Sequence, residues 1–111
     1  MIEKNKPYVL VFGISIYDIF GFSYPNYRPY DSNPGQIRTS CGGVCRNIAE
    51  NMSRVGIPTK FISILGDDQQ GAEILRQAAK TGLDMSDSLI IEGGATPTYL
   101  AILDENGEMV S

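Results

Sequence analysis

Histidine is absent from the sequence, cysteine occurs only twice, and basic residues are fewer than acidic ones. Without histidine, the chain cannot form Ser–His–Asp or Cys–His catalytic pairs, a histidine-ligated zinc site or a histidine pH switch. Nine Lys and Arg residues stand against thirteen Asp and Glu, which gives a formal net charge of −4. This balance argues against a general binder of nucleic acid or of anionic membranes, because both require a positive field.

The two cysteines, Cys41 and Cys45, have a C-x3-C spacing. A redox pair normally has the spacing C-x-x-C, and a zinc site would need two further ligands that this chain could supply only as carboxylates. We therefore expect both to be small, buried packing residues in a reducing cytosol.

Long apolar runs are also missing. No stretch approaches the ~20 apolar residues that cross a membrane, and residues 1–7 are not followed by the apolar segment of a signal peptide. We expect a soluble, cytoplasmic chain.

The order of the expected elements is typical of an α/β domain. Hydrophobic residues make up 42% of the 111 residues, enough for the core of one domain. The apolar run at 8–12 predicts a strand covered on both faces, as in a parallel sheet. Further strands are expected at 14–23, 36–41, 59–65, 88–91 and 98–103, helices at 44–55 and 71–81, and a surface loop at 24–35. Residues from 108 onward complete a hairpin with 98–103, which suggests a separate small sheet.

The helix expected at 44–55 has apolar residues at helical spacing, with Ala49 beside them: Val44, Ile48, Met52 and Val55. Gly56 followed by Pro58 is a strong signal for its end. Asp67 and Asp68 precede the next helix, where a loop or capping role is favoured over a metal carboxylate pair.

Two glycines directly before a helix can bring backbone close to a ligand, because no Cβ intervenes. Gly42 and Gly43 occupy this place, and Asn47 follows one turn later with both donor and acceptor groups. The helix N-terminus adds free N–H groups, so the segment could bind a polyol or an anion. The alternative is a tight strand-to-helix turn with a solvated Asn. Asp18, beyond the first strand, could accept two hydrogen bonds from sugar hydroxyls, although taken alone it fits an exposed loop residue better.

Common phosphate-binding motifs are absent. The Walker pattern G-x-x-x-x-G-K-[ST] does not occur, and Ser15 stands where G-x-G-x-x-G would require its second glycine after Gly13. Nucleotide folds of those two types are therefore not expected.

The segment 42–49, with Gly56 and Gly66 at fixed distances after it, resembles the first signature of the ribokinase-like (PfkB) carbohydrate kinases. Residues 9–13 leading to Asp18 resemble the family's opening strand. Gly66-Asp67-Asp68 followed by Gly71 is similar to its G-x-D-x-x-G stretch, and residues 98–107 resemble its lid hairpin. The text Gly-Gly-Val-x-Arg-Asn-Ile-Ala-Glu-Asn is most similar to the pseudouridine kinase-like branch.

The resemblance implies a Rossmann-like α/β fold of the ribokinase type: a mostly parallel sheet flanked by helices, with a small β-sheet lid from about 14–40 and 96–111. It implies ATP-dependent transfer of the γ-phosphate to a hydroxyl of a small sugar or nucleoside, with ATP and Mg²⁺ as cofactors and a homodimer formed through the lid. Asp18 and Asn47 would each bind substrate hydroxyls, and Gly42 and Gly43 would form a hinge that touches the substrate.

Three residues depart from the family pattern. Cys45 replaces another small residue and preserves its size. Val44 replaces a lysine found in ribokinase and Ile16 an asparagine, and these two departures bear on the substrate. The later Gly-Ala-Gly-Asp motif, which supplies the base and the phosphate-binding backbone, does not occur. We therefore expect residues 1–111 to be the N-terminal portion of a single kinase domain, without catalytic residues, metal ligands or the C-terminal ATP-binding portion. The alternatives are a non-catalytic sugar- or metabolite-binding module that reuses the fold, and a fragment whose lid strands serve only dimerisation.

Overall fold

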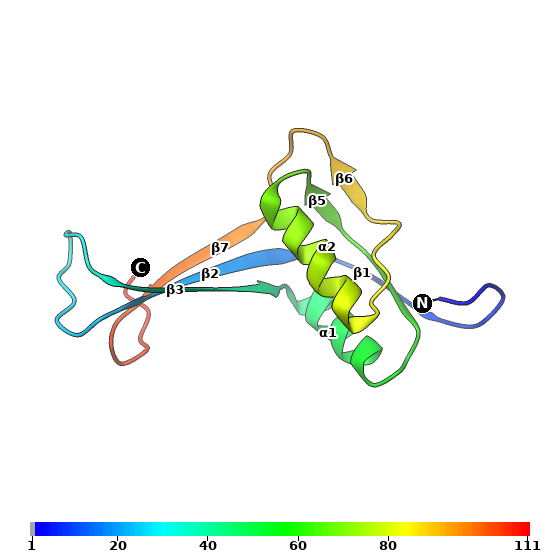
Figure 1. Ribbon diagram of the computed structural model, residues 1–111, viewed down its shortest axis with the longest axis horizontal. Helices are drawn as coiled ribbons and strands as arrows, with labels where there is room; N and C mark the ends of the chain where they lie inside the picture. The colour runs from blue at the N-terminus through cyan, green and yellow to red at the C-terminus, as the bar shows by residue number, and fades with distance from the viewer. Residues whose placement is uncertain (1) are drawn as a thin grey trace.

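The computed structural model describes residues 2–111, which form a body and a projecting arm (Figure 1). The body holds both helices and the short parallel strands. The arm is a separate three-stranded sheet that carries the molecule to a length of 58 Å, against 33 and 18 Å in the other directions. The α/β class and the separate small sheet expected from the sequence are both confirmed.

The strands of the body are parallel. β1 (Val9–Phe12) pairs with β4 (Thr59–Ile62), and β5 (Ile64–Gly66) pairs with β6 (Leu89–Ile91). β4 and β5 are the two halves of the strand expected at 59–65, interrupted at Ser63. The Ser63 N–H donates to Ser88 Oγ at 3.1 Å, and the buried Ser15 hydroxyl donates to Ser63 Oγ at 3.1 Å. Side-chain oxygens therefore replace regular strand pairing at this break.

Two helices lie against the body strands (Figure 1). α1 (Val44–Arg54) and α2 (Gln69–Thr81) pack against a buried core that consists of Ala49, Phe61, Leu65, Ile74, Ala78, Leu83 and Met85. α2 begins two residues earlier than expected, because the Asp68 carboxylate accepts a hydrogen bond from the Gly71 N–H at 2.9 Å and caps the helix. Within residues 2–111, neither helix has the length and apolar character needed to cross a membrane.

The buried side of α1 differs from the side that its apolar spacing indicates. Val44, Ile48 and Val55 are exposed, Val44 by 77%, whereas Ala49 and the charged Arg46 are buried. Helix propensity and spacing correctly placed the helix. Because α1 packs closely on β4, the side that carries the small Ala49 is the one that is buried. The apolar stripe of α1 is consequently left open to solvent in this structure.

The arm consists of β2 (Ile16–Ser23), β3 (Gly35–Gly42) and β7 (Thr98–Leu103), with β2 in the middle. β2 runs antiparallel to β3 and parallel to β7. The expected loop lies at the far end of the arm, between β2 and β3 (Figure 1). A turn after β7 and a bridge between Leu103 and Met109 form the expected hairpin, although residues 108–111 are not a regular strand.

Asp68 also ties the start of the third arm strand to the body. Its carboxylate accepts hydrogen bonds from the Thr96 N–H at 2.8 Å and from the Thr96 hydroxyl at 2.6 Å. The buried Thr96 hydroxyl oxygen accepts in turn from the Gly66 N–H at 3.0 Å. These bonds, first of all the one from the Thr96 hydroxyl, lower the pKa of the Asp68 carboxyl. The capping role expected for the Asp67-Asp68 pair is thus confirmed for Asp68.

Candidate functional site

The chain passes between body and arm at three places that lie close together. Residues 13–15 lead from β1 into β2, Gly42 and Gly43 lead from β3 into α1, and residues 92–97 lead from β6 into β7. The Tyr17 N–H donates to the Pro97 carbonyl at 2.9 Å, which joins the first and third crossings. The four residues singled out from the sequence lie at or beside this junction.

Asp18 lies against the backbone of Gly42. A Cβ on Gly42 would be 2.3 Å from Asp18 Oδ2 and 3.2 Å from its Cγ. A side chain at position 42 would therefore displace the Asp18 carboxylate from the place that it occupies here. Glycine at position 42 thus leaves room for a carboxylate from the neighbouring strand.

Gly43 has a backbone conformation that L-residues rarely adopt. Its φ is 101° and its ψ is 135°, and a Cβ there would lie 2.5 Å from the Ile14 carbonyl oxygen. Its own carbonyl accepts the first hydrogen bond of α1, from the Asn47 N–H at 2.9 Å. Gly43 thus turns the end of an arm strand directly into a body helix.

Asn47 projects from the first turn of α1 beside a buried arginine that the sequence did not single out. Arg46 Nη1 donates to the Asn47 Oδ1 at 3.3 Å and to the Cys41 carbonyl at 3.0 Å. Nη1 and Nη2 also contact the Glu50 carboxylate, at 3.4 and 3.1 Å. The only sequence signal for this role is a charged residue flanked by the glycine pair and Asn47, and charged helical residues are usually solvated.

Two features of its environment act in opposite directions on the pKa of Asp18. Partial burial raises the pKa of the Asp18 carboxyl above its ordinary value, and the Arg46 guanidinium opposes that shift. The site thus combines a carboxylate acceptor, an amide and the N–H groups of a helix start that has no side-chain cap. Such a set is suited to binding neighbouring hydroxyl groups.

The cysteines flank this junction as free thiols. Burial, as the largest effect, raises the pKa of the Cys41 thiol, which keeps it protonated. Both side chains pack against the buried core, in agreement with the packing role expected. Among residues 2–111, no three Asp, Glu or Cys side chains are grouped so that they could hold a metal ion.

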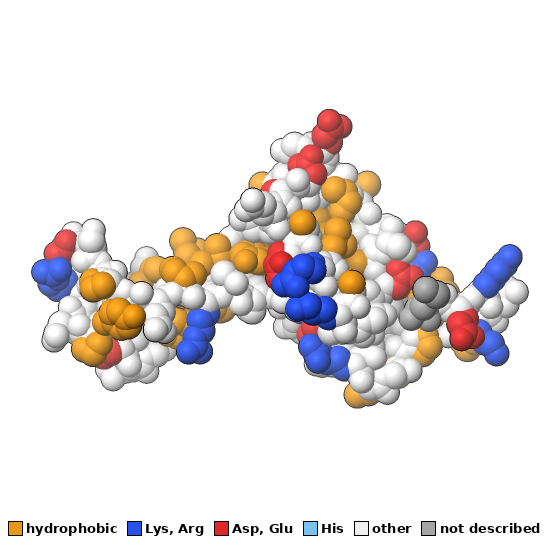
Figure 2. All heavy atoms as spheres, viewed as in Figure 1, with side chains coloured by type: hydrophobic (Ala, Val, Ile, Leu, Met, Phe, Trp, Pro, Cys, Tyr) orange, Lys and Arg blue, Asp and Glu red, His pale blue; other side chains and the backbone are white. Residues whose placement is uncertain are grey.

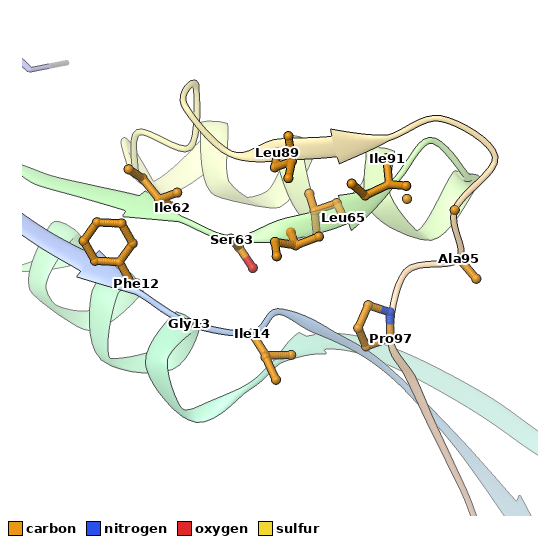
Figure 3. Close-up of a pocket in the computed structure, with 13 residues that line it drawn as sticks. Phe12, Gly13, Ile14, Ile62, Ser63, Leu65, Leu89, Ile91, Ala95 and Pro97 are labelled. Atoms are coloured by element: carbon orange, nitrogen blue, oxygen red, sulfur yellow. The ribbon is translucent and has the colours of Figure 1, made fainter.

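An apolar cavity of about 670 Å³ adjoins the junction (Figure 3). Hydrophobic side chains from the ends of the body strands line it, among them Phe12, Ile14, Leu89 and Ile91, with the Ser63 hydroxyl as a polar exception. Asp18, Gly42, Gly43 and Asn47 do not line it. Ile14 connects the two features, because its side chain lines the cavity while its carbonyl contacts the position of Gly43.

Comparison with known proteins assigns the chain to a family. The family model described as pfkB family carbohydrate kinase matches residues 6–111. The chain belongs to the pfkB family of carbohydrate kinases. The resemblance noted in the signature segment is therefore confirmed over nearly the whole sequence.

Relatives of this pfkB chain include sugar and nucleoside kinases. A pseudouridine kinase of Escherichia coli (strain K12) is 37% identical over 107 residues, which cover 96% of this chain and 34% of that protein. A crystal structure of a candidate sugar kinase from Clostridium perfringens is 63% identical, with a TM-score of 0.90 over 97% of this chain and 34% of that one. This chain therefore spans about a third of the length of the relatives it matches.

The ribokinase-type fold is shared with more distant kinases as well. A fructokinase from Xylella fastidiosa, solved with bound ATP, has a TM-score of 0.73 at 23% identity, over 91% of this chain and 30% of that one. The fold class expected from the sequence is confirmed by these similarities.

The geometry of Gly43 leads to a stability prediction. Gly43→Ala should lower the free energy of unfolding by more than Gly56→Ala, because both positions have a positive φ but only position 43 adds a backbone clash. We expect about 1–2 kcal/mol for Gly56→Ala from conformational strain alone and at least about 2 kcal/mol more for Gly43→Ala from the contact with Ile14. Denaturant unfolding of the two variants measures the difference. Equal losses would show that the crossing at residue 43 tolerates a side chain.

Proposed function

We propose that this chain is the substrate-binding, N-terminal portion of an ATP-dependent kinase that transfers a γ-phosphate to a hydroxyl of a sugar or nucleoside. The observation that carries the proposal is the Asp18 carboxylate held against Gly42 at the end of β3, two residues before α1, in a chain of the pfkB family. Asp18 and Asn47 bind substrate hydroxyls, and Gly42 and Gly43 let the substrate approach the backbone. The arm acts as a lid that closes over the substrate and excludes water.

We include ATP and Mg²⁺ in the proposal because the chain belongs to the pfkB family of kinases. None of the residues described above is proposed to bind them. ATP supplies the transferred phosphoryl group and Mg²⁺ neutralises its charge. The printed sequence has no Walker motif, and residues 2–111 offer no cluster that fits a metal ion. We therefore assign both sites, and the catalytic base, to a part of the protein beyond these residues.

The uncovered face of the body supports this division of the domain. The helices cover one face of the strands, and hydrophobic side chains on the strands remain exposed: Leu10, Phe12, Ile64, Leu89 and Ile91. A sheet of this kind is normally buried on both faces. We assign its cover to the two thirds of the relatives' length that this chain does not span.

A polar substitution on this open face tests whether the rest of the protein covers it. Ile64 is 59% exposed here, so Ile64→Ser would change stability by less than about 0.5 kcal/mol if nothing covered it. In the complete protein we expect a loss of about 2 kcal/mol or more, because a buried isoleucine contributes that much. Denaturant unfolding gives the value, with Tyr24→Ser as the control, because the Tyr24 side chain is 49% exposed in the loop between β2 and β3. A neutral Ile64→Ser would contradict the proposed cover.

Two aromatic rings next to Asp18 support a nucleoside as the substrate. Tyr99 lies opposite Asp18 in the pairing of β2 with β7, so both side chains are on the same face of the arm. The ring of Phe20 lies 6.1 Å from that of Tyr99 in an edge-to-face arrangement. A planar base could stack on the exposed part of Tyr99 while its sugar binds at Asp18. The relative from Escherichia coli named pseudouridine kinase is consistent with this substrate class.

Loss of the Tyr99 ring should therefore affect nucleosides more than free sugars. We expect Tyr99→Leu to lower kcat/KM for pseudouridine and other nucleosides by about 5- to 150-fold, the range for stacking of one base on an aromatic ring. The value for ribose should remain nearly unchanged. Tyr24→Leu is a matched control, because Tyr24 is 49% exposed and Tyr99 43%. A parallel loss for ribose and nucleosides would contradict base stacking.

The decisive test of the proposed function is phosphorylation of a panel of sugars and nucleosides by the complete protein with ATP. Asp18→Asn should lower kcat/KM by about 10- to 150-fold, because a hydrogen bond to a charged group contributes about 1.5–3 kcal/mol. Asp31→Asn should leave activity unchanged, because the Asp31 carboxylate lies in the exposed loop, where it pairs with Arg28 at the surface and accepts a hydrogen bond from the Ser32 N–H. Substrate binding without phosphate transfer would favour the non-catalytic module instead.

The arm also has the surface expected of a dimer contact. Figure 2 shows hydrophobic side chains along it, and Ile37 and Leu100 are more than half exposed. We propose that a second copy covers this surface. The need for ATP, together with two free thiols, supports a reducing cytoplasmic compartment.

A further inference from the structure

Arg46 is a buried charge at the centre of the candidate site. Its side chain is only 3% exposed, and its guanidinium reaches three groups around the junction. One is the carbonyl of Cys41, which immediately precedes Gly42; the second is the amide oxygen of Asn47; the third is the Glu50 carboxylate. Arg46 is also close enough to Asp18 to act on its charge.

These contacts fix which edge of the Asn47 amide is available to a ligand. Arginine has only donors, so the atom of Asn47 that faces it must be the acceptor Oδ1. The donor Nδ2 is then on the other edge, and among residues 2–111 no acceptor is hydrogen-bonded to it. Asn47 itself is exposed, so this free donor is open to a substrate.

The opposite polarity holds at Asp18. An ionised carboxylate can only accept hydrogen bonds, and its approach to Gly42 places it at the same junction. A substrate that spans the two residues therefore meets an acceptor at position 18 and a donor at position 47. Two neighbouring hydroxyl groups can satisfy both, one by donating its proton and the other by accepting with its oxygen.

Stability alone does not explain an arginine here. Burial of a charge is costly unless all its hydrogen bonds are made. Within residues 2–111, the Nε–H of Arg46 is a buried donor without a partner, which by itself costs about 1–3 kcal/mol. Arg54 contacts the same Glu50 carboxylate at 3.4 Å from an exposed position, so Glu50 does not need a buried partner.

We propose that Arg46 is a positioning residue that sets the hydrogen-bond polarity of the substrate site, with Asn47 as donor and Asp18 as acceptor for a pair of neighbouring hydroxyls. This inference rests on the proposed function for the identity of the ligand. It does not depend on phosphate transfer, because the pattern of hydrogen-bond donor and acceptor affects how the ligand binds, whether or not a reaction follows.

Asn47→Asp is the most direct test, since it keeps an oxygen that faces Arg46 and replaces the donor Nδ2 with a carboxylate oxygen that can only accept. We expect calorimetry on the complete protein to show at least about a 10-fold weaker affinity for nucleosides. We also expect the variant and the wild type to bind one deoxynucleoside with nearly equal affinity. This is the analogue, 2′- or 3′-deoxy, that lacks the hydroxyl to which Asn47 donates. If Asn47 instead presented its oxygen to the ligand, Asn47→Asp would bind as well as the wild type, and the proposal would be wrong.

Arg46→Lys tests the positioning role, because lysine keeps the charge but cannot hold the Cys41 carbonyl, the amide and Glu50 together. We expect it to weaken nucleoside binding and to shrink the effect of Asn47→Asp, since the amide is then free to turn. Arg54→Lys is the control, because Arg54 contacts the same Glu50 carboxylate. It should change neither the nucleoside affinity nor the effect of Asn47→Asp. An unaltered Asn47→Asp effect in the Arg46→Lys background would overturn the positioning role.

The outcomes also separate this inference from the proposed function. Suppose that the wild-type protein binds nucleosides, that Asn47→Asp abolishes this binding, and that no phosphate is transferred. This result would support the proposed donor and acceptor roles and refute the kinase activity. Protein that neither binds nor phosphorylates any member of the panel would overturn both.

Discussion

The close approach of the Asp18 carboxylate to the backbone of Gly42 is the contact on which the arrangement of arm, strand end and helix depends. Asp18 belongs to the central strand of the arm, and Gly42 is the last residue of the neighbouring strand. A Cβ at position 42 would lie 2.3 Å from the carboxylate and would push it out of this position. The next residue, Gly43, then starts α1 with a positive φ. Three of the residues proposed to bind substrate, Gly42, Gly43 and Asn47, therefore share one short stretch of backbone, and the Asp18 side chain packs against it from the neighbouring strand.

Small residues hold α1 at this point. A Cβ on Gly13 would lie 2.3 Å from the Cβ of Cys45, so the first turn of the helix rests directly on the end of β1. This contact explains why position 13 is glycine, because a Cβ there would collide with both the Cβ and the Sγ of Cys45. It also brings Arg46 beneath the helix, where its long side chain reaches back to the strand end.

Much of the architecture could be predicted from local sequence, because turns and helix ends have local causes. Gly56 and Gly82, both with positive φ, end the two helices where their spacing indicates. The features that were missed are set by distant contacts. The break at Ser63 depends on Ser88 and Ser15, and the buried side of α1 depends on close packing against β4. The glycine pair and Asn47 could be found from their spacing, whereas Arg46 could not, since nothing local marks a charged helical residue as buried.

The polar junction and the apolar cavity are coupled through residue 14. The Ile14 side chain lines the cavity, while its carbonyl oxygen is the atom that excludes any side chain at Gly43. Ser15, which follows, is fully buried and bonded to Ser63, so this segment has little freedom of its own. A segment that packs into the cavity must therefore press on the same stretch of backbone that supports the hinge. A change in the residues that line the cavity should therefore alter the backbone at Gly43, and with it the proposed substrate site, even though the cavity and the junction share no polar contact.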